Sequence, residues 1–308
     1  MYKKNINHAI KFLKEGNLVC FPTETVYGLG ADATNDSAIL KIYKTKNRPA
    51  NNPLIIHTYS IDSAKKIAIF NDDANKLSVL WPGPLTLVMQ QKNNAISINA
   101  TNNLKTIAIR IPSHPLCHEI LKEFGGYIAA PSANPSGYIS STKFEHVMEH
   151  YGSSEEIYIF DEDDCVYGIE STIIDVSNDE PVMLRHGFIE EKTIEKLLGK
   201  KIIQNKTSNI IAPGMLDKHY SPYSKIRLNA EILGEKEVGI GFGKVNGMFE
   251  MNLSTKGDLK EAAFNLYDLL RKSDKIALQM NKSIAISPIP NKDLGVAIND
   301  KLRRAEIK

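Results

Sequence analysis

Short apolar runs alternate with segments of helical periodicity up to about residue 200, and this alternation constrains the fold more than any other feature of the chain. The apolar runs have the length and composition of buried strands, and they lie at 18–21, 54–57, 87–90, 107–111, 127–130, 157–160, 172–176 and 182–184. Segments with helical spacing lie between them at 5–15, 37–43, 60–70, 71–80 and 114–124. Asp36 is the expected cap of the segment 37–43, and Thr142 with Glu145 has the spacing of a capping box before a further helix. This order predicts an α/β fold in which helices cover a sheet.

The length of the chain, 308 residues, predicts two domains rather than one core. Residues 204–224 are polar, contain proline and glycine, and have no clear period, as is typical of a linker. Strand-like runs at 226–228, 237–242 and 283–287 and helical runs at 258–273 and 295–305 follow. We therefore expect a first domain over 1–203, a linker over 204–224 and a small α/β domain over 225–308.

Composition narrows the class of protein. The chain is 42% hydrophobic and 24% charged with a net charge of +2, which is ordinary for a soluble globular protein and argues neither for nor against nucleic-acid binding. Three scattered cysteines without a CxxC pattern argue against zinc and for a reducing compartment. No apolar run predicts a signal peptide or a membrane span, so we expect a cytoplasmic protein with no membrane partner.

A cluster of cations precedes the second predicted strand. In "KTKNRPANNPLIIHT", Lys44, Lys46 and Arg48 occupy alternate positions before the apolar run. Two further arginines, Arg110 and Arg185, end predicted strands. Guanidinium groups match the geometry of phosphates and carboxylates, so these cations indicate a nucleotide or polyanion site.

Two polar loops accompany the cations. They are "PTETVYGLGADA" and "PSANPSG", and loops after strands build the ligand sites of α/β sheets. Ser132 has no visible histidine and aspartate partners, which favours a hydroxyl that bonds phosphate over a nucleophile. The glycine-rich stretch 239–247 fails both the P-loop and the Rossmann pattern, and we expect a loop there.

Six motifs in order resemble the threonylcarbamoyl-AMP synthases, the YrdC/Sua family. They are "FPTETVYGLGADA", Lys46-Asn47-Arg48 with "PLIIH", "WPGPLT", Arg110-Ile111-Pro112, Ser132-Ala133-Asn134 with "PSG", and "GIESTIIDV". "APGMLDKHYSP" resembles the linker of the two-domain members, and "NLYDLLRKSD" and "LGVAINDKLRRA" resemble their C-terminal domain. The resemblance implies a YrdC-like twisted open mixed sheet with flanking helices, followed by a small Rossmann-like α/β domain.

The resemblance also implies a reaction. L-threonine, bicarbonate and ATP, the last with Mg²⁺, would give threonylcarbamoyl-AMP and pyrophosphate, so the chain would be a nucleotidyltransferase. A downstream tRNA threonylcarbamoyl-transferase complex would then modify the adenosine beside the anticodon of ANN-decoding tRNAs. No metal ligand among the protein side chains is implied.

Matching positions suggest roles for individual residues. Lys46 and Arg48 would act in catalysis, by stabilising charge on the departing pyrophosphate. The threonine would be held by Thr25, His57, Arg110, the backbone near Ala130, Ser171 and Thr172, with Arg110 on its carboxylate. ATP would be held by Lys46, Arg48, Asn52, Thr106, Ser132, Asn134, Ser140, Arg185 and Tyr220, with Tyr220 of the linker closing over the nucleotide.

Two alternatives stay open. The first is a non-catalytic module that binds double-stranded RNA or tRNA, since residues 1–60 hold eight Lys or Arg against four acids. Weak RNA binding is compatible with that basic segment, although interleaved stacking aromatics are missing. The second is a carbamoyltransferase of the hydrogenase-maturation type, whose zinc-finger region three scattered cysteines do not match.

Overall fold

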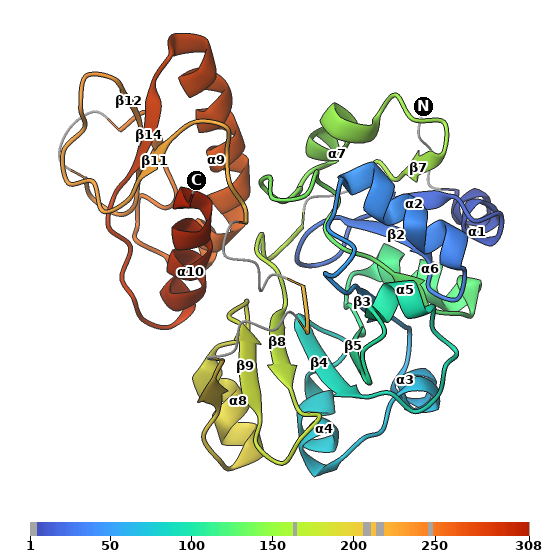
Figure 1. The fold of residues 1–308 in the computed structure, drawn as a ribbon. Helices are drawn as coiled ribbons and strands as arrows, with labels where there is room; N and C mark the ends of the chain where they lie inside the picture. The colour runs from blue at the N-terminus through green and yellow to red at the C-terminus, as the bar shows by residue number, and fades with distance from the viewer. Residues whose placement is uncertain (1–4, 163–164, 206–210, 214–218, 246–248, 308) are drawn as a thin grey trace.

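A computed structural model describes residues 5–162, 165–205, 211–213, 219–245 and 249–307. It has a large mixed sheet with flanking helices, drawn blue to yellow in Figure 1, and a smaller C-terminal α/β unit, drawn orange to red. The fold class expected from the sequence is confirmed.

The large sheet has ten strands in the order β10-β9-β8-β4-β5-β3-β6-β2-β1-β7. The strands are β1 Leu18–Phe21, β2 Gly28–Asp32, β3 Ile55–His57, β4 Leu85–Gln90, β5 Thr106–Arg110, β6 Ile128–Ala129, β7 Ile157–Ile159, β8 Thr172–Asp175, β9 Val182–Arg185 and β10 Ile203–Gln204. Some pairs are parallel, such as β3 with β5, and others are antiparallel, such as β4 with β5. The sheet is therefore mixed.

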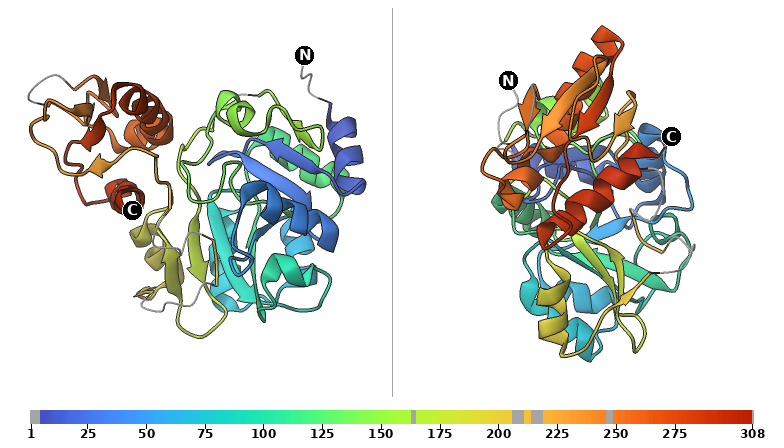
Figure 2. Two further views of the ribbon diagram at one scale, coloured as in Figure 1. Left: turned by 45° about the horizontal axis from the view of Figure 1, so that its top comes forward. Right: turned by 90° about the vertical axis from the view of Figure 1, so that its left-hand side faces the viewer.

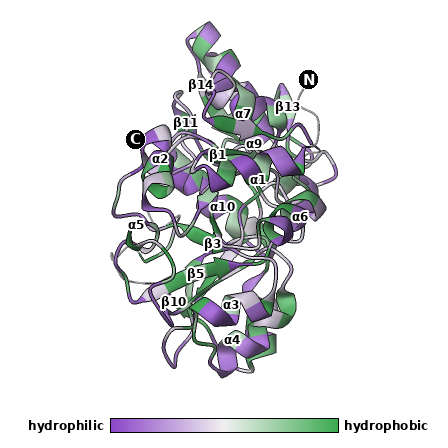
Figure 3. Cartoon of the chain, turned by 90° about the vertical axis from the view of Figure 1, so that its right-hand side faces the viewer, coloured by the Kyte–Doolittle hydropathy of each residue, from purple (hydrophilic) through white to green (hydrophobic). Residues whose placement is uncertain are grey.

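Helices cover both faces of this sheet. They are α1 Ile6–Lys14, α2 Asp36–Lys46, α3 Ile61–Ile67, α4 Asp72–Leu77, the 3-10 turn η1 Ser78–Leu80, α5 Ile98–Thr101, α6 Pro115–Phe124, α7 Phe144–Tyr151 and α8 Glu191–Leu198. In β1, Leu18 and Cys20 enter the core that α2 and α7 cover, whereas Val19 and Phe21 enter the core under α1 and α6. This alternation is the period of a strand buried on both sides. Figure 3 shows the central strands β3 and β5 in the hydrophobic colour.

The C-terminal domain is built on a four-stranded sheet, β11-β14-β12-β13, in which every pair is parallel. Its strands are β11 Ile226–Arg227, β12 Glu237–Gly241, β13 Met251–Asn252 and β14 Ser283–Ile286, and its helices are α9 Leu259–Met280 and α10 Leu294–Glu306. Of the glycine-rich stretch, 239–241 belong to β12, and 246–248 lie outside the described residues.

Three local expectations differ from the structure. The stretch after β1 was expected as loop, but its second half forms β2, whose glycines carry no strand signal. Helix α2 continues to Lys46 and is capped by Asn35 rather than by Asp36. The expected capping box at Thr142 is wrong, because α7 begins at Phe144 after Lys143, which makes no side-chain cap.

The two domains share a hydrophobic cluster. Val26, Ile139 and Ile169 of the large domain pack with residues of α9 such as Leu266. The left view of Figure 2 shows the C-terminal domain beside the large sheet. Within the part of the chain that the structure describes, no helix is long and apolar enough to cross a membrane; the longest, α9, has 22 residues and is amphipathic.

Candidate active site

A pocket opens where the ends of β3 and β5 meet the loops after β1 and β6. It is lined by Thr23, Thr25, Val26, Tyr27, Gly28, Arg48, Ile55, His57, Arg110, Ala130, Pro131, Ser132, Glu170, Arg185, Pro213 and His219. The cavity volume is about 40 Å³, which is room for a few water molecules. Pro213 and His219 of the inter-domain segment form part of its wall, so this segment restricts access to the cavity.

The end of α2 places two cations beside the pocket. Asn47 has φ 51 in the left-handed region, which asparagine tolerates, and it ends the helix between Lys46 and Arg48. The Arg48 Nε donates to the carbonyl of Asn52 at 3.1 Å and its Nη2 to that of Pro53 at 3.0 Å. Lys46 and Arg48 are buried, whereas Lys44 is exposed, so only two of the three cations in the sequence cluster face the interior.

The Lys46-Asn47-Arg48 and Ser132-Ala133-Asn134 triplets contact each other directly. The Lys46 Nζ donates to the carbonyl of Ser132 at 2.6 Å and also to that of Asn134. The Ser136 N–H donates back to the Lys46 carbonyl at 2.8 Å. The Asn134 Nδ2 donates to the carbonyls of Pro135 and Tyr138, which closes the loop. Triplets that are 86 residues apart therefore form one polar unit.

Arg110 lies at the end of β5 in a buried ion pair. Its Nη2 lies 2.8 Å from Glu24 Oε1, both side chains are 5% exposed, and its Nη1 donates to Thr25 Oγ1 at 2.8 Å. The register β3–β5 places His57 opposite Arg110. Among the described residues, His57 Nδ1 has no hydrogen-bond partner, so the pocket wall offers one unused polar atom beside a guanidinium.

Arg185 ends β9 and faces the same pocket. Its Nε donates to the Ser171 carbonyl and its Nη2 to Ser171 Oγ, both at 3.0 Å. Gly187 permits this contact, because a Cβ there would lie 2.2 Å from the Thr172 nitrogen.

Burial and mutual repulsion shift the pKa values of the basic groups. Burial, with Arg48 nearby, holds the pKa of Lys46 well below its ordinary value. Burial lowers the pKa of Arg48 to about 10 and that of His57 to about 3, the latter with help from Arg110. The pKa of His219 also falls well below its ordinary value through burial and the cations around it. An anionic ligand would relieve this repulsion.

The structure brings together seven of the site residues expected from the sequence on the pocket wall: Thr25, Arg48, His57, Arg110, Ala130, Ser132 and Arg185. Four others adjoin it: Lys46 and Asn134 through the loop contacts above, and Ser140 and Ser171 through bonds to Glu170 and Arg185. Asn52 is fully buried, and its side-chain amide has no partner among the described residues.

Three expected residues lie away from the pocket wall. Thr106 begins β5, four residues from Arg110 at about 3.3 Å per residue. Thr172 donates its hydroxyl to the Ile189 carbonyl at 2.7 Å. Tyr220 stacks on Tyr267 of α9 with ring centroids 5.6 Å apart, and its neighbour His219 lines the pocket instead.

Sequence reasoning did not single out Glu24, Glu170 or His219. Glu24 and Glu170 stand inside motifs that were quoted, but an acidic side chain beside an anion site offered no reason to select it. Their positions depend on contacts with Arg110 and Tyr267 that are distant in sequence.

The side chains around the pocket indicate how the expected Mg²⁺ would be bound. In the described ranges, no group of three or more His, Cys, Asp or Glu residues is arranged to hold a metal ion. Glu170, a carboxylate on the pocket wall, already accepts hydrogen bonds from Ser140 and Tyr267. Mg²⁺ usually keeps several waters and binds through substrate phosphates, so these residues suit an ion that enters with ATP.

Comparisons with known proteins cover both domains. A family model described as "Telomere recombination" matches residues 11–187, and one described as "Threonylcarbamoyl-AMP synthase, C-terminal domain" matches residues 189–306. The threonylcarbamoyl-AMP synthase of Bacillus subtilis is 35% identical over 323 residues, which span 97% of this chain and 92% of that protein. That of Pyrococcus abyssi is 35% identical over 322 residues, with 97% and 93% covered.

A solved structure agrees with these matches. The crystal structure of Pyrococcus abyssi Sua5 complexed with L-threonine superposes with a TM-score of 0.88 and 34% identity, over 98% of this chain and 94% of that one. The agreement extends across both domains and includes the large sheet that carries the pocket. The chain therefore belongs to the threonylcarbamoyl-AMP synthase family, as an enzyme of the nucleotidyltransferase type with both the synthase domain and the C-terminal domain.

Proposed function

We propose that this chain converts L-threonine, bicarbonate and ATP into threonylcarbamoyl-AMP and pyrophosphate. One observation carries the proposal: a single pocket joins Arg110 and His57 to a second set of cations, Arg48 and Arg185. A carboxylate and a polyphosphate need separate basic groups, and the pocket supplies both within one cavity. Related proteins point the same way: two relatives are threonylcarbamoyl-AMP synthases, and the Pyrococcus abyssi Sua5 structure contains L-threonine.

The amino-acid half of the proposed site surrounds Arg110. Its guanidinium would hold the threonine carboxylate in place of part of its contact with Glu24. Thr25 and His57 would contact the rest of the amino acid, with the Ala130 backbone and Ser171 completing the pocket. Because the pKa of His57 is lowered to about 3, its imidazole is neutral near pH 7. It would therefore serve as a hydrogen-bonding group without charge.

The nucleotide half would use Arg48, Arg185, Lys46, Asn52 and the loop from Ser132 to Ser140. These groups would hold the phosphates, and Mg²⁺ would enter on the ATP and neutralise phosphate charge. As pyrophosphate departs, negative charge grows on its oxygens. Lys46 and Arg48 would stabilise that charge most strongly, which is the catalytic role expected of them.

The chemistry proceeds in two steps that need no dedicated acid and base pair. The threonine nitrogen attacks the carbon of carbon dioxide, formed from bicarbonate by loss of hydroxide, and the nitrogen gives up a proton to water. A carbamate oxygen then attacks the α-phosphorus of ATP, and the bond to the β-phosphate oxygen breaks to release pyrophosphate. Positioning and electrostatics supply the catalysis.

The inter-domain segment would act as the lid that keeps water from the carbamate. Ala212 is fully buried beneath the large sheet, the Ser221 N–H donates to the Gly137 carbonyl at 2.8 Å, and His219 lines the pocket. A passive tether would not be packed in this way. Residues 214–218 of the segment lie outside the described residues. ATP entry requires the lid to move, because the cavity holds only about 40 Å³ as it stands.

The product would supply the threonylcarbamoyl group for modification of the adenosine next to the anticodon of ANN-decoding tRNAs. A separate tRNA threonylcarbamoyl-transferase complex would carry out that transfer. This chain needs only to release the intermediate for that purpose. Retention on a tRNA column together with absence of ATP turnover would favour the RNA-binding module instead.

Pyrophosphate release from ATP tests the proposed function. The full chain is used, because Val26, Ile139 and Ile169 would lose their packing partners in a truncated one. Release should require threonine, bicarbonate, ATP and Mg²⁺ together, and should stop when any one is omitted. Release that continues without threonine or without bicarbonate would contradict the proposal.

A further inference from the structure

Several buried polar side chains of the C-terminal domain lie against the large domain. Among them are Tyr267 and Arg271 of α9, which are 0% and 2% exposed, and Lys301 of α10, which is 1% exposed. Burying a charged group is costly unless it is paired and hydrogen-bonded. The partners of these side chains therefore show what the domain contact is arranged to hold.

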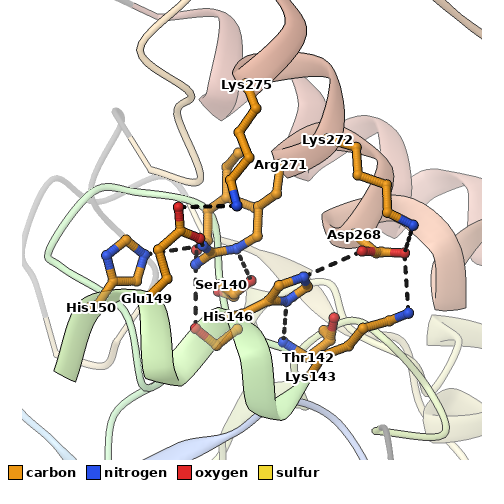
Figure 4. Close-up of polar contacts among 12 residues, drawn as sticks. Ser140, Thr142, Lys143, His146, Glu149, His150, Asp268, Arg271, Lys272 and Lys275 are labelled. Carbon is orange, nitrogen blue, oxygen red and sulfur yellow. Dashed lines mark hydrogen bonds and ion pairs between the residues drawn. The ribbon is translucent and has the colours of Figure 1, made fainter. Parts of the chain in front are cut away.

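Arg271 holds the loop that follows the Ser132-Ala133-Asn134 triplet. Its guanidinium donates to the carbonyls of Ile139 and Ser140 and to Ser141 Oγ at 3.3 Å (Figure 4). Ser141 Oγ in turn donates to the Ala133 carbonyl at 2.6 Å. Ser141 therefore links Arg271 by hydrogen bonds to the triplet that Lys46 contacts.

Tyr267 holds an acidic residue of the pocket wall. Its hydroxyl donates to Glu170 Oε2 at 2.7 Å, and Ser140 Oγ donates to Glu170 Oε1 at 2.6 Å. Glu170 lines the pocket and is 5% exposed. A carboxylate with one donor on each oxygen is fixed in orientation, and one of these two donors comes from the second domain.

Lys301 holds the turn after Arg185. Its Nζ donates to the His186 carbonyl at 2.8 Å and lies 3.7 Å from Glu170 Oε2. The same ammonium lies 5.5 Å from the centre of the Tyr220 ring. The C-terminal domain therefore reaches two segments that carry expected nucleotide-binding residues, around Ser140 and Arg185, and the pocket-lining Glu170.

No comparable contact reaches the other half of the pocket. Arg110, Thr25 and Glu24 bond to one another, and His57 is held in β3 by strand pairing. Other contacts of α9 reach the same loop or lie outside the pocket. Asp268 lies 3.3 Å from His146, whose Nδ1 accepts from the Thr142 N–H at 3.2 Å, whereas Lys275 pairs with Glu149 at 3.1 Å (Figure 4). None of these contacts reaches the half around Arg110.

We propose that the C-terminal domain is a fixed part of the nucleotide half of the active site, in which Tyr267, Arg271 and Lys301 are positioning residues for the loop 138–142, Glu170 and the turn after Arg185. None of the three lines the pocket, so each acts through the segment that it holds. This inference rests on the proposed function in that a nucleotide occupies this half.

Tyr267→Phe is the sharpest variant, because it removes one hydroxyl and keeps the ring stacked on Tyr220. We expect the KM for ATP to rise about tenfold, the equivalent of about 1.4 kcal/mol. The KM for threonine and the thermal unfolding midpoint should change little. Arg271→Lys, which keeps the charge and loses the fork, should also raise the KM for ATP, and less than Arg271→Met does. Lys275→Ala, on the same helix and across the same interface, serves as the matched control and should leave both KM values unchanged.

Binding of a non-hydrolysable ATP analogue, measured by calorimetry without threonine, separates this inference from the proposed function. Weaker analogue binding by Tyr267→Phe supports the inference even if the wild-type chain makes no threonylcarbamoyl-AMP. Equal analogue binding by wild type and Tyr267→Phe overturns it, as does a Tyr267→Phe variant in which both KM values rise together. If Arg271→Met does not fold, Tyr267→Phe still decides between these outcomes.

Discussion

The two halves of the pocket are built by different means. The half around Arg110 is held by strand pairing within one sheet and by a buried ion pair with Glu24. The half around Ser132, Glu170 and Arg185 is formed by loops and strand ends that are hydrogen-bonded to one another and to the second domain. Strand pairing gives a rigid site for a small ligand, whereas loops permit a large ligand to enter and leave. The difference suits a small amino acid on one side and ATP on the other.

The largest expected effect concerns the side chain of the amino acid. A site that bonds a hydroxyl rejects an analogue without it, because buried polar groups such as His57 Nδ1 would remain unpaired. Valine should therefore be turned over with a kcat/KM lower by about 10⁴ than threonine. Serine, which lacks one methyl group, should fall by roughly 10- to 200-fold. Competition assays with the three amino acids measure this, and equal turnover of valine and threonine would show that no such pocket exists.

Arg110→Met should lower both the stability of the chain and its binding of threonine. The unfolding free energy should drop by about 3–5 kcal/mol, because the variant leaves the carboxylate of Glu24 buried without its partner. Threonine binding should disappear as well. The double variant Glu24→Gln with Arg110→Met should recover much of the stability in urea unfolding and none of the threonine binding. A single variant as stable as wild type would mean that the ion pair is not buried as described.

Arg48→Ala probes the other half. Removal of a charge-assisted contact should weaken ATP binding by about 1.5–3 kcal/mol, with a smaller change for threonine alone. Lys44→Ala is the matched control, since Lys44 is a cation of the same cluster but is exposed. Unchanged turnover of Arg48→Ala at limiting ATP would remove Arg48 from the nucleotide half.

Protection of the inter-domain segment from proteolysis by bound ligands should be an effect of moderate size. Limited proteolysis within 212–222 should slow when ATP and threonine are both present, because the closed lid covers both halves of the pocket. Threonine alone should protect less, since its half lies within the sheet. Equal cleavage rates under all conditions would reduce the segment to a tether.

The smallest effect concerns pH. Because the folded chain holds the pKa of His57 near 3 against an ordinary 6.5, the unfolded chain binds more protons between these values. The unfolding free energy should therefore rise with pH across that window, and His57→Asn should flatten the slope by at most about 1.4 kcal/mol per pH unit. His8→Asn, on the exposed surface of α1, is the control. A slope that His57→Asn leaves unchanged would mean that His57 does not titrate differently in the two states.

The sequence predicted the rigid half of the site better than the loop half. Strand periodicity placed His57 and Arg110 at strand ends, and the sheet register then brought them together. The sequence predicted Lys44, Lys46 and Arg48 in one cluster. In the structure, helix α2 exposes Lys44, whereas Lys46 and Arg48 are buried. Tyr220 was expected at the nucleotide, yet a stacking partner in α9 holds its ring elsewhere, and His219 faces the pocket.

Tertiary contacts explain what remained hidden. The carboxylate of Glu170 is oriented by a hydrogen bond from Tyr267, which is 97 residues away in the sequence. A local sequence pattern does not predict a contact at that separation. The cap of α2 was misplaced by one residue, since Asn35 and Asp36 are both good capping residues and only backbone geometry decides between them. Fold class depends on many repeated signals, whereas each of these details depends on one contact.

Isotope tracing tests the central claim most directly. The full chain is incubated with ATP, Mg²⁺, threonine and ¹³C-labelled bicarbonate, and the nucleotide products are analysed at once by mass spectrometry. The account predicts an adenylate that carries threonine and one labelled carbon, formed together with pyrophosphate. Pyrophosphate formed without any such adenylate, or an adenylate of threonine that lacks the labelled carbon, would contradict it.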